Sequence, residues 1–531
     1  MTPTGDTLAA LIDRHARLRP DDVAIRYGEL QWTWAEWASR IHRAAGALRA
    51  EGIRRGDRVA FLDRNHPACL EVLFAASSIG AATTVVNWRV AGDEMVHVLQ
   101  DSGARLLFVG AELRAAAAAA ADRVPGLERL VVVGGGDEDD DEDADEYESL
   151  LAAAPPVPAD AEVDAGETAL VIYSSGTTGL PKGVLLSQRA LINHAANLTP
   201  AFPLAEGDAN LVAMPLFHVG GVGYSVFGIA AGTPTIITRE PDAASLIAAV
   251  RAGATHAFLV PPLIARLLAD GEETIAAISR LRYLVYGAAP MPSSLLQQTL
   301  ATWPETNVVQ VYGQTEVCGA VTALNDADHR DASRPNVRLS AGKALPGGQI
   351  RVVDPETGSD RLPGQPGEIW VRGNQTMTGY LNRPEATAET ITADGWVRTG
   401  DIGRFDADGY VYIEDRIKDM IITGGENVYG PEVESVLTQH PAVADAAVIG
   451  VPDDFWGESI KAIVVTTAET IGKDRQEDTA DDIIEFCRRH LAGYKCPKTI
   501  EFVSSLPRNA SGKILKTTLR EPYWRGRARA I

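Results

Sequence analysis

Cysteine is scarce in this chain of 531 residues, which contains only four. Four cysteines cannot cross-link a chain of this length into a disulfide framework. Cys487 and Cys496 have eight residues between them, and no His/Cys cluster lies near Cys69 or Cys318, so a structural zinc site is not indicated. This usage is typical of a reducing compartment, and we expect a cytoplasmic protein.

Basic residues are also too few to balance the acidic ones. Lys plus Arg number 49 against 71 Asp plus Glu, which gives a net charge of −22. An acidic surface repels phosphate backbones, so nucleic acid is not an expected partner. Ten of the twelve residues from Asp137 to Glu148 are carboxylates. Such a run is typical of a solvated loop, with a docking or metal-buffering role as the alternative.

Long apolar runs are missing as well. The longest uncharged segment, 211–238, contains His218, two prolines and five glycines. This composition favours a buried core segment over a transmembrane helix. The apolar stretch near the N-terminus, Leu8–Ile12, is too short for a secretory signal.

Short apolar runs rich in β-branched residues alternate with longer segments of helical periodicity. Helices are expected at 34–51 and 67–80, and the alanine run 115–121 is helical by propensity. This alternation predicts an α/β fold of layered, mainly parallel sheets. The expected buried strands are Val59–Leu62, Leu106–Val109, Leu130–Val133, Leu170–Tyr173, Thr235–Thr238, Ala257–Val260, Tyr283–Tyr286 and Val308–Val311.

The pattern changes beyond Gly342. Glycine and proline separate short expected strands at 349–353, 368–373 and 409–414, which predicts a compact β unit. A helix opened by Pro431 then begins a small α+β domain. Its expected later elements are strands at 446–451, 459–465 and 499–503 and a helix at 479–491. We therefore divide the chain into a large N-terminal domain (1–414), a hinge (415–419) and a mobile C-terminal domain (420–531).

The densest group of potential ligand-binding residues is the string Tyr173–Gly183, directly after an expected strand. It contains four serine and threonine hydroxyls, three glycines and Lys182. Glycine lets backbone N–H groups approach an anion, and hydroxyls and a lysine complete a phosphate cradle. The spacing does not match a Walker A loop, and Pro181 favours an extended loop. The alternative is a flexible connector.

Three shorter strings carry further candidates. Tyr312–Glu316 follows an expected strand, where α/β sheets bind ligands, and Glu316 could hold a divalent cation. Arg398–Asp401, with Asp415–Arg416 further on, could bind ribose and phosphate. Pro507–Lys513 places a lysine after a glycine turn. Taken singly, each string has a simpler interpretation. Tyr312–Glu316 could be an ordinary turn, and Arg398–Asp401 with Asp415–Arg416 could be a capped turn with a surface ion pair. The lysine of Pro507–Lys513 could be an ordinary surface lysine.

Together these strings resemble the adenylate-forming superfamily of acyl-CoA synthetases, peptide-synthetase adenylation domains and beetle luciferases. The resemblance runs from Thr33–Glu36 to Leu515–Lys516 and includes Pro215–His218 and Gly424–Asn427. The string Asp415–Ile422 is most similar to bacterial fatty-acid and aryl-acid CoA ligases. One departure is visible: Tyr429-Gly430-Pro431-Glu432 has its proline one position later than relatives do.

The resemblance implies a reaction of two halves. A carboxylate first attacks the α-phosphorus of ATP, with Mg²⁺, to give an acyl-adenylate and pyrophosphate. The thiol of coenzyme A (CoA) then displaces AMP. Lys513, Thr315, Glu316, Lys182 and His218 are the implied catalytic residues, with Glu316 binding the metal.

The resemblance also implies a set of nucleotide and CoA contacts. The phosphates would lie on Ser174, Ser175, Gly176, Thr177, Thr178, Gly179 and Lys182, and the α-phosphate near Gly313 and Thr315. The adenine would lie between Gly287, Ala288, Ala289 and Tyr312, and the ribose on Asp401 and Arg416. The C-terminal domain would rotate about Lys418, so that Lys513 leaves and Gly424 and Gly425 enter to line the CoA tunnel.

The acyl substrate is the least constrained feature. His218 would sit at the mouth of its pocket, with Val219–Tyr224 and Val317–Gly319 as walls. These small residues favour a roomy apolar pocket, or else they only permit close helix packing. Since no lysine or arginine falls in these walls, a hydrophobic fatty or aryl monocarboxylate is the expected substrate.

Three alternatives stay open. The adenylate could pass to a carrier protein, an amine or another acceptor instead of CoA. A silent nucleotide-binding protein is disfavoured because Lys182, Glu316, Asp401 and Lys513 are all present. Assembly as a homodimer is left open.

Overall fold

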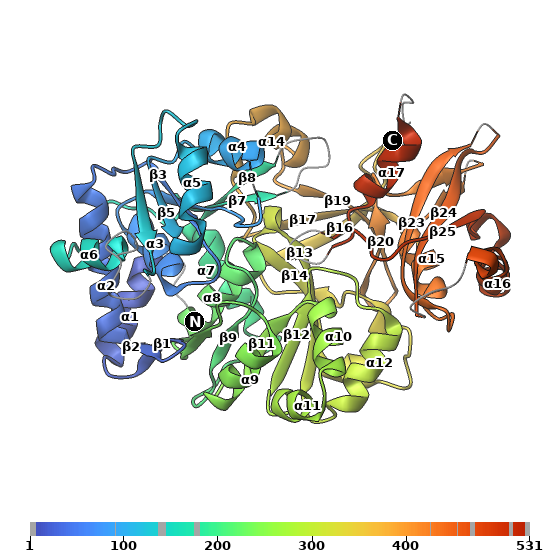
Figure 1. Cartoon of the computed structure of the whole chain (residues 1–531), viewed down its shortest axis with the longest axis horizontal. Coiled ribbons are helices and arrows are strands. Elements are labelled where there is room, and N and C mark those ends of the chain that lie inside the picture. Colours follow the sequence, from blue (N-terminus) through green and yellow to red (C-terminus); the bar gives the residue numbers. More distant parts are fainter. Residues whose placement is uncertain are drawn as a thin grey trace.

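A computed structural model gives the fold and describes residues 7–90, 92–135, 145–174, 181–424, 426–453, 455–467, 473–508 and 513–525. The fold contains two mainly parallel sheets, a smaller antiparallel sheet and a C-terminal sheet (Figure 1). The predicted α/β class is therefore confirmed. The candidate site lies where the first three sheets meet the C-terminal domain.

The first sheet is seven-stranded and parallel from β7 to β6, with β8 and β18 added antiparallel at one edge. In sheet order its strands are β18 (Gly379–Tyr380), β8 (Lys182–Ser187), β7 (Thr168–Ser174), β4 (Ala82–Val85), β3 (Arg58–Leu62), β5 (Leu106–Gly110) and β6 (Arg129–Val133). The strands β7 and β8 pair antiparallel, and the expected phosphate loop connects them in the sequence.

The second sheet is nine-stranded and parallel from β13 to β1, with antiparallel strands at both edges. In sheet order its strands are β15 (Lys343–Ala344), β14 (Gly319–Leu324), β13 (Asn307–Gln314), β12 (Tyr283–Gly287), β11 (His256–Leu259), β9 (Asn210–Val212), β10 (Thr235–Ile237), β1 (Val23–Tyr27) and β2 (Leu30–Thr33). All eight expected buried strands lie in these two sheets, and six of them match their expected bounds within one residue, whereas β7 begins two residues earlier and β13 ends three residues later than expected.

Apolar helices join the two sheets into one core. The largest cluster of buried side chains draws on both sheets, for example Ile172 of β7 and Val309 of β13, and on the helices between them. These helices are α1 (Leu8–Leu18), α2 (Trp34–Ala50), α3 (Pro67–Ser78), α7 (Gln188–Leu198) and α8 (Val219–Ala231). The helices α3 and α8 are buried on almost all sides. Since α8 makes up the middle of the segment 211–238, this segment belongs to the core, as predicted.

The remaining helices of the N-terminal part cover the outer faces of the sheets. Those of the first sheet are α4 (Gly92–Ser102) and α5 (Arg114–Ala121), whereas α6 (Glu146–Ala153) packs against α2 and contributes Tyr147 and Leu151 to the central core. Those of the second are α9 (Ala243–Arg251), α10 (Pro261–Ala269), α11 (Glu272–Ile278), α12 (Ser293–Thr302) and α13 (Asp326–Arg330), and α14 (Pro384–Thr390) precedes the third sheet. None of the helices in the described ranges combines the length and the hydrophobicity that crossing a membrane would need.

The third sheet is the compact β unit that the sequence predicts. Its antiparallel strands are β16 (Gly348–Val353), β17 (Gly367–Gly373), β19 (Val397–Phe405) and β20 (Val411–Arg416). The expected strand 409–414 is shifted, because Asp406 and Tyr410 close a turn and Gly409 has φ +82°. β20 therefore runs into the expected hinge as far as Arg416, which pairs with Asp401 of β19.

The C-terminal part forms its own sheet, with helices packed on it (Figure 1, orange to red). Its strands are β21 (Ile421–Thr423), β22 (Glu426–Val428), β23 (Val443–Asp453), β24 (Gly457–Thr466) and β25 (Thr499–Phe502), and its helices α15 (Gly430–Leu437), α16 (Lys473–His490) and α17 (Lys516–Trp524). Pro431 lies in the first turn of α15 as predicted, whereas α16 begins earlier than expected.

The end of the acidic run differs from the expected solvated loop. Of this run the structure describes Asp145 to Glu148, and these residues open α6 with Asp145 as its N-cap. Tyr147 is buried, and its hydroxyl donates to Glu71 at 2.8 Å. Arg40 bridges Glu71 and Glu148. The buried carboxylate of Glu71 needs these partners, which explains why this part of the run folds against the core.

Candidate active site

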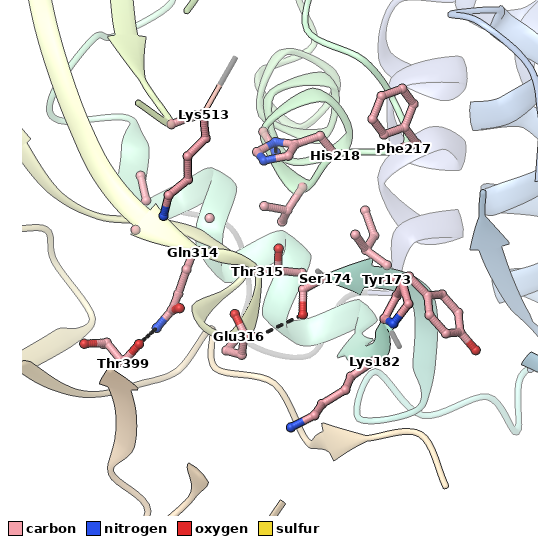
Figure 2. A pocket seen from close by; sticks show the side chains of 18 of the residues that line it. Tyr173, Ser174, Lys182, Phe217, His218, Gln314, Thr315, Glu316, Thr399 and Lys513 are labelled. Atoms are coloured by element: carbon pink, nitrogen blue, oxygen red, sulfur yellow. Dashed lines mark hydrogen bonds between the residues drawn. The ribbon is translucent and has the colours of Figure 1, made fainter. Parts of the chain in front are cut away.

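A cavity of about 860 Å³ lies between the carboxyl ends of the parallel strands and the C-terminal domain. Its walls come from β7, β8 and β13, from the third sheet, and from the segment that precedes α17. Figure 2 shows Lys513 and His218 on one side of this space and Glu316 and Lys182 on the other. Residues far apart in the sequence therefore converge here, as expected for a ligand site in an α/β fold.

Glu316 is held by two hydroxyl groups. The chain turns directly after β13, and this turn carries Thr315 and Glu316 into the cavity. The Ser174 hydroxyl at the end of β7 donates to Glu316 Oε1 at 3.2 Å, and the Tyr380 hydroxyl donates to the same oxygen at 3.0 Å. Lys182 Nζ lies 5.2 Å from the centroid of the Tyr380 ring. The other carboxylate oxygen of Glu316 is left for a cation or a donor.

Asp401 is fixed in the same way at the edge of the third sheet. Its Oδ2 accepts a hydrogen bond from the Tyr312 hydroxyl at 2.7 Å, and its Oδ1 lies 3.2 Å from Arg416 Nε. Burial and the Asp401 charge raise the pKa of Tyr312 well above its ordinary value, so the phenol stays protonated as a donor. Gly400, with φ +69°, shapes the turn that presents Asp401.

Lys513 reaches the cavity from the C-terminal domain and points toward Gln314 (Figure 2). Burial and the nearby charge of Arg416 lower the pKa of Lys513 to about 8. The neighbouring side chain of Gln314 is anchored by a hydrogen bond from its Nε2 to the Thr399 carbonyl at 3.3 Å. A lysine with a lowered pKa in a cleft of anion-binding groups is a candidate catalytic residue.

The other end of the cavity is mainly apolar, but Arg89 also lines the cavity and its guanidinium carbon lies 5.8 Å from the centroid of the Phe217 ring, a cation that the expected wall segments did not include. His218 is the N-cap of α8, and its Nδ1 accepts the Gly220 N–H at 3.0 Å, so Nε2 carries the ring proton. Burial lowers the pKa of His218 to about 4, which keeps the imidazole neutral. The walls around it are mainly apolar and aromatic: Leu198, Phe202, Phe217, Val219, Tyr224, Phe258 and Val285.

Several glycines at the site are required by close packing. A Cβ on Gly287 would lie 2.4 Å from the Val311 carbonyl oxygen, and one on Gly313 would lie 1.8 Å from that of Gly319. Ala288 lines the cavity with φ +64°, a strained conformation that turns the chain at the end of β12. The segment 287–289 thus reaches the cavity through Ala288.

Other expected residues are not all brought to the cavity. Lys418 and Gly424 lie outside its lining, as do the expected nucleotide residues Asp401, Gly287 and Ala289 and the expected wall residues Gly221, Val317 and Cys318. A Cβ on Gly221 would lie 2.1 Å from the Pro215 carbonyl oxygen, so this glycine serves helix packing. The expected phosphate-binding residues Ser175, Gly176, Thr177, Thr178 and Gly179, and the expected CoA residue Gly425, are outside the described part of the chain.

Three residues at the site carry no signal in the local sequence. Tyr380 reaches Glu316 from the β18 edge of the first sheet. Glu368 accepts the Gly400 N–H at 3.1 Å and the Trp370 indole N–H at 2.8 Å, which fixes the turn before Asp401. His194 of α7 lines the apolar end. Only the fold brings them near the other site residues.

The sequence and the fold match known proteins over nearly their whole length. A feruloyl-CoA synthase from Amycolatopsis sp is 38% identical over 96% of this chain and 98% of its own. A fatty acid–[acyl-carrier-protein] ligase from Streptomyces coeruleorubidus is 35% identical over 100% and 99%. The solved structure of an anthranilate CoA ligase in complex with anthranoyl-AMP has a TM-score of 0.87 at 26% identity, covering 98% of both chains.

A second solved structure carries a nucleotide and a metal. It is o-succinylbenzoate CoA synthetase from Bacillus subtilis in complex with ATP and a magnesium ion, with a TM-score of 0.81, 28% identity, and coverage of 96% of this chain and 98% of that one. The family model described as AMP-binding enzyme matches residues 12–381, and that of the AMP-binding enzyme C-terminal domain matches 432–513. The chain therefore belongs to the adenylate-forming family of AMP-binding enzymes.

Proposed function

We propose that this enzyme activates a hydrophobic carboxylic acid with ATP and then transfers the acyl group to CoA. One observation carries the proposal. Lys513 enters from the C-terminal domain the same cavity that holds Thr315 and Glu316 of the N-terminal domain, and Asp401 is bonded to two residues of its lining, Tyr312 and Arg416. Such an arrangement serves a reaction in which an anion must approach a polyphosphate.

In the first half-reaction the acid's carboxylate oxygen forms a bond to the α-phosphorus of ATP. The bond from that phosphorus to the bridging oxygen breaks, and pyrophosphate leaves with the electron pair. Repulsion between the two anions is the main obstacle, so fixed cations and donors supply the catalysis. We assign Lys513 to the carboxylate and α-phosphate, Lys182 to the outer phosphates and Thr315 to the α-phosphate. The proton on His218 Nε2 is placed to donate to the acid.

Magnesium fits the donor set. Glu316 offers one carboxylate oxygen beside the hydroxyl-bonded one, and no group of three or more His, Cys, Asp or Glu that could hold a metal occurs in the described ranges. Mg²⁺ typically binds through one or two carboxylates together with substrate phosphates, so a single glutamate is sufficient. When bound, the ion neutralises charge on the phosphates. Glu316, oriented by Ser174 and Tyr380, would hold it.

The nucleoside is assigned to the third-sheet side of the cavity. Asp401, buried and oriented by Tyr312, is placed to accept hydrogen bonds from the ribose hydroxyls, and Arg416 braces the same region. The adenine would lie beside Ala288 and Tyr312, which both line the cavity.

The second half-reaction requires a different arrangement of the C-terminal domain. The thiolate sulfur of CoA attacks the acyl carbon, and AMP leaves with its oxygen. We assign the hinge to Lys418, which lies between the last strand of the third sheet and the first strand of the C-terminal sheet. Rotation there would withdraw Lys513 and bring Gly424 and Gly425 to the cavity. The division into 1–414, 415–419 and 420–531 is part of this proposal.

The acyl substrate is proposed to be hydrophobic because the wall around His218 is apolar. Relatives named for ferulate, indoleacetate and long-chain fatty acids are consistent with that class. The relative named as an acyl-carrier-protein ligase gives a second candidate, in which the acceptor is the phosphopantetheine thiol of a carrier protein.

Acid-dependent exchange of radioactive pyrophosphate into ATP tests the first half-reaction without any acceptor. We expect exchange with at least one fatty or aryl acid and none without acid. CoA and a phosphopantetheinylated carrier protein can then be offered in competition for the adenylate. Thioester on CoA supports the first candidate, and thioester on the carrier protein supports the second. No exchange with any acid of the panel would contradict acid activation.

A further inference from the structure

A buried polar cluster joins the third sheet to the C-terminal domain beside the hinge. Asp415, on β20, is 6% exposed and does not line the cavity. Its Oδ2 accepts the backbone N–H of Gly430, the first residue of α15, at 2.9 Å. The N-cap residue of this helix, Tyr429, makes no capping bond with its own side chain. A carboxylate on the third sheet therefore caps a helix of the C-terminal domain, at the end where the helix dipole favours negative charge.

Lys516 completes the cluster from α17, the helix that follows Lys513. Its Nζ lies 2.8 Å from Glu434 Oε1 on α15, and its side chain is 11% exposed. A Cβ on Gly430 would lie 2.5 Å from Lys516 Nζ and 3.5 Å from Asp415 Oδ2, so the ammonium and this carboxylate meet at the glycine. Although burial opposes it, the charges of Glu434 and Asp415 raise the pKa of Lys516 above its ordinary value. Lys516 is therefore charged at neutral pH.

The cluster depends on the glycine that moves the proline of Tyr429–Glu432 to a later position. Proline has no N–H, so a proline at 430 could not donate to Asp415, and its Cβ would crowd Lys516 Nζ. The helix itself does not require a glycine there. Residue 430 is the first helical position, which proline favours, and Tyr429 before it is extended, with φ −97° and ψ 117°. Gly430 therefore serves the contact with Asp415 and Lys516, not the start of α15.

The contacts of Asp415 lie across the proposed hinge. Asp415 belongs to β20, which pairs with β19 in the third sheet, ahead of Lys418 in the chain. Gly430, Glu434 and Lys516 all follow Lys418 and belong to helices of the C-terminal domain. Rotation at Lys418 would therefore separate Asp415 from Gly430 and Lys516. The ion pair of Glu434 and Lys516 would move as one unit.

The segment that bears Lys513 is attached to the same place. Lys516, the first residue of α17, lies three residues after Lys513. Further along this helix, Arg520 Nη1 donates to the Lys418 carbonyl at 2.9 Å, and Arg520 Nη2 lies 2.8 Å from Asp419 Oδ1. These contacts fix the start of α17 against the hinge, and with it the point from which Lys513 reaches the cavity.

We propose that Asp415 is a positioning residue for adenylation, whose contacts with Gly430 and Lys516 hold the C-terminal domain in the orientation that places Lys513 in the cavity. The inference rests on the proposed function, in which Lys513 acts in the first half-reaction alone. Asp415 touches no substrate in this account and acts through Lys513. Because rotation for the second half-reaction breaks its contacts, they favour adenylation over thioester formation.

Three variants weaken the contact in different ways. Asp415→Ala removes the acceptor and its charge, and Asp415→Asn keeps an acceptor oxygen without the charge. The double variant Gly430→Pro with Pro431→Ala removes the N–H and moves the proline to the first helical position. Asp242→Ala is the matched control, since Asp242 caps α9 through the Ser245 N–H at 2.8 Å and lies outside the cavity. Each variant is measured in pyrophosphate exchange and in thioester formation from a supplied acyl-adenylate and CoA.

Asp415→Ala should slow adenylation about tenfold, and the other two variants about threefold, with thioester formation unchanged or faster. Asp242→Ala should change neither rate. In a Lys513→Ala background, Asp415→Ala should slow adenylation less than about twofold further, because the two residues act as one unit. An equal fall in both half-reactions, or effects of Asp415→Ala and Lys513→Ala that multiply, would overturn the inference while the ligase function stands.

If Asp415→Ala does not fold, Asp415→Asn and the double proline variant decide the question by the same two rates. No exchange by the wild type with any acid would instead remove the proposed function, and this inference with it.

Discussion

The two ends of the cavity are built on opposite principles. At the nucleotide end the polar groups are charged and held by other polar groups, as Tyr312 and Arg416 hold Asp401. At the acyl end the histidines are neutral, the walls are aromatic, and His194 and Tyr224 keep an unpaired polar atom within the described residues. A preorganised charged end suits a reaction shared by a whole family. An apolar end with few polar atoms suits selection of one acid. Changes at one end should therefore affect the chemistry, and changes at the other the choice of acid.

The largest effect is expected from Lys513→Ala. Loss of this cation should slow adenylation by about a thousandfold, as for other groups that stabilise transition-state charge. Thioester formation from a supplied acyl-adenylate and CoA should persist, since that step is proposed to proceed with Lys513 withdrawn. Rapid-quench assays of each half-reaction measure the two rates. An equal fall in both rates would contradict the proposal that Lys513 serves only adenylation. The control is Lys461→Ala, which removes a lysine that is paired with Glu501 outside the cavity.

Glu316→Gln should have the next largest effect. The amide keeps an oxygen for the Ser174 and Tyr380 hydroxyls but removes the charge that would hold Mg²⁺. We expect about a hundredfold lower adenylation rate, and a loss of the Mg²⁺-dependent part of ATP binding in calorimetry. ATP binding that depends on Mg²⁺ as strongly as in the wild type would place the ion elsewhere.

Alkaline pH should impair the nucleotide end through Lys513. Because its pKa is lowered to about 8, the side chain is charged below that pH and neutral above it. The value of kcat/KM for ATP, which reports the free enzyme, should therefore fall about fivefold from pH 8 to pH 9. Lys513→Arg should move this alkaline fall in kcat/KM to higher pH, because arginine stays protonated. If the fall stays at the same pH in Lys513→Arg, the titrating group is a residue other than Lys513.

The smallest effect, and the one confined to the acyl end, is expected from Gly220→Ala. The added Cβ would lie 3.0 Å from both His218 Nδ1 and Phe258 Cε1, so it narrows the pocket mouth. The KM for the acid should rise about fivefold while the KM for ATP is unchanged. Gly126→Ala adds a methyl group where no heavy atom lies within 4 Å and is the matched control. A parallel rise in both KM values would show that the two ends are not separable.

The nucleotide end was predictable because its residues lie in short strings after buried strands. Thr315 and Glu316 follow the apolar strand β13 directly, so the strand pattern places them at its carboxyl end. Asp401 lies on β19 of another sheet, and its string Arg398–Asp401 is what marked it as a candidate. Tyr380, on the edge strand β18, and Glu368, on the interior strand β17 of the third sheet, were missed because only the fold brings these strands near the site. His194 was missed because a histidine on an apolar helix face is usually a core residue.

The fold shows the same contrast. Fully buried apolar strands such as β5 were predicted within a residue, whereas β9, with three residues, is too short to show periodicity. The edge strand β2 is half-exposed and carries polar residues, so it has no apolar run. The end of the acidic run forms a helix because of its contact with Glu71, which no local pattern indicates.

The most direct test of the account is to incubate the protein with ATP, Mg²⁺, CoA and a panel of fatty and aryl acids, and to quantify AMP and thioesters by mass spectrometry. We predict AMP and one class of acyl-CoA in equal amounts. AMP or free adenylate without acyl-CoA would contradict CoA as the acceptor, and no AMP with any acid would contradict acid activation itself.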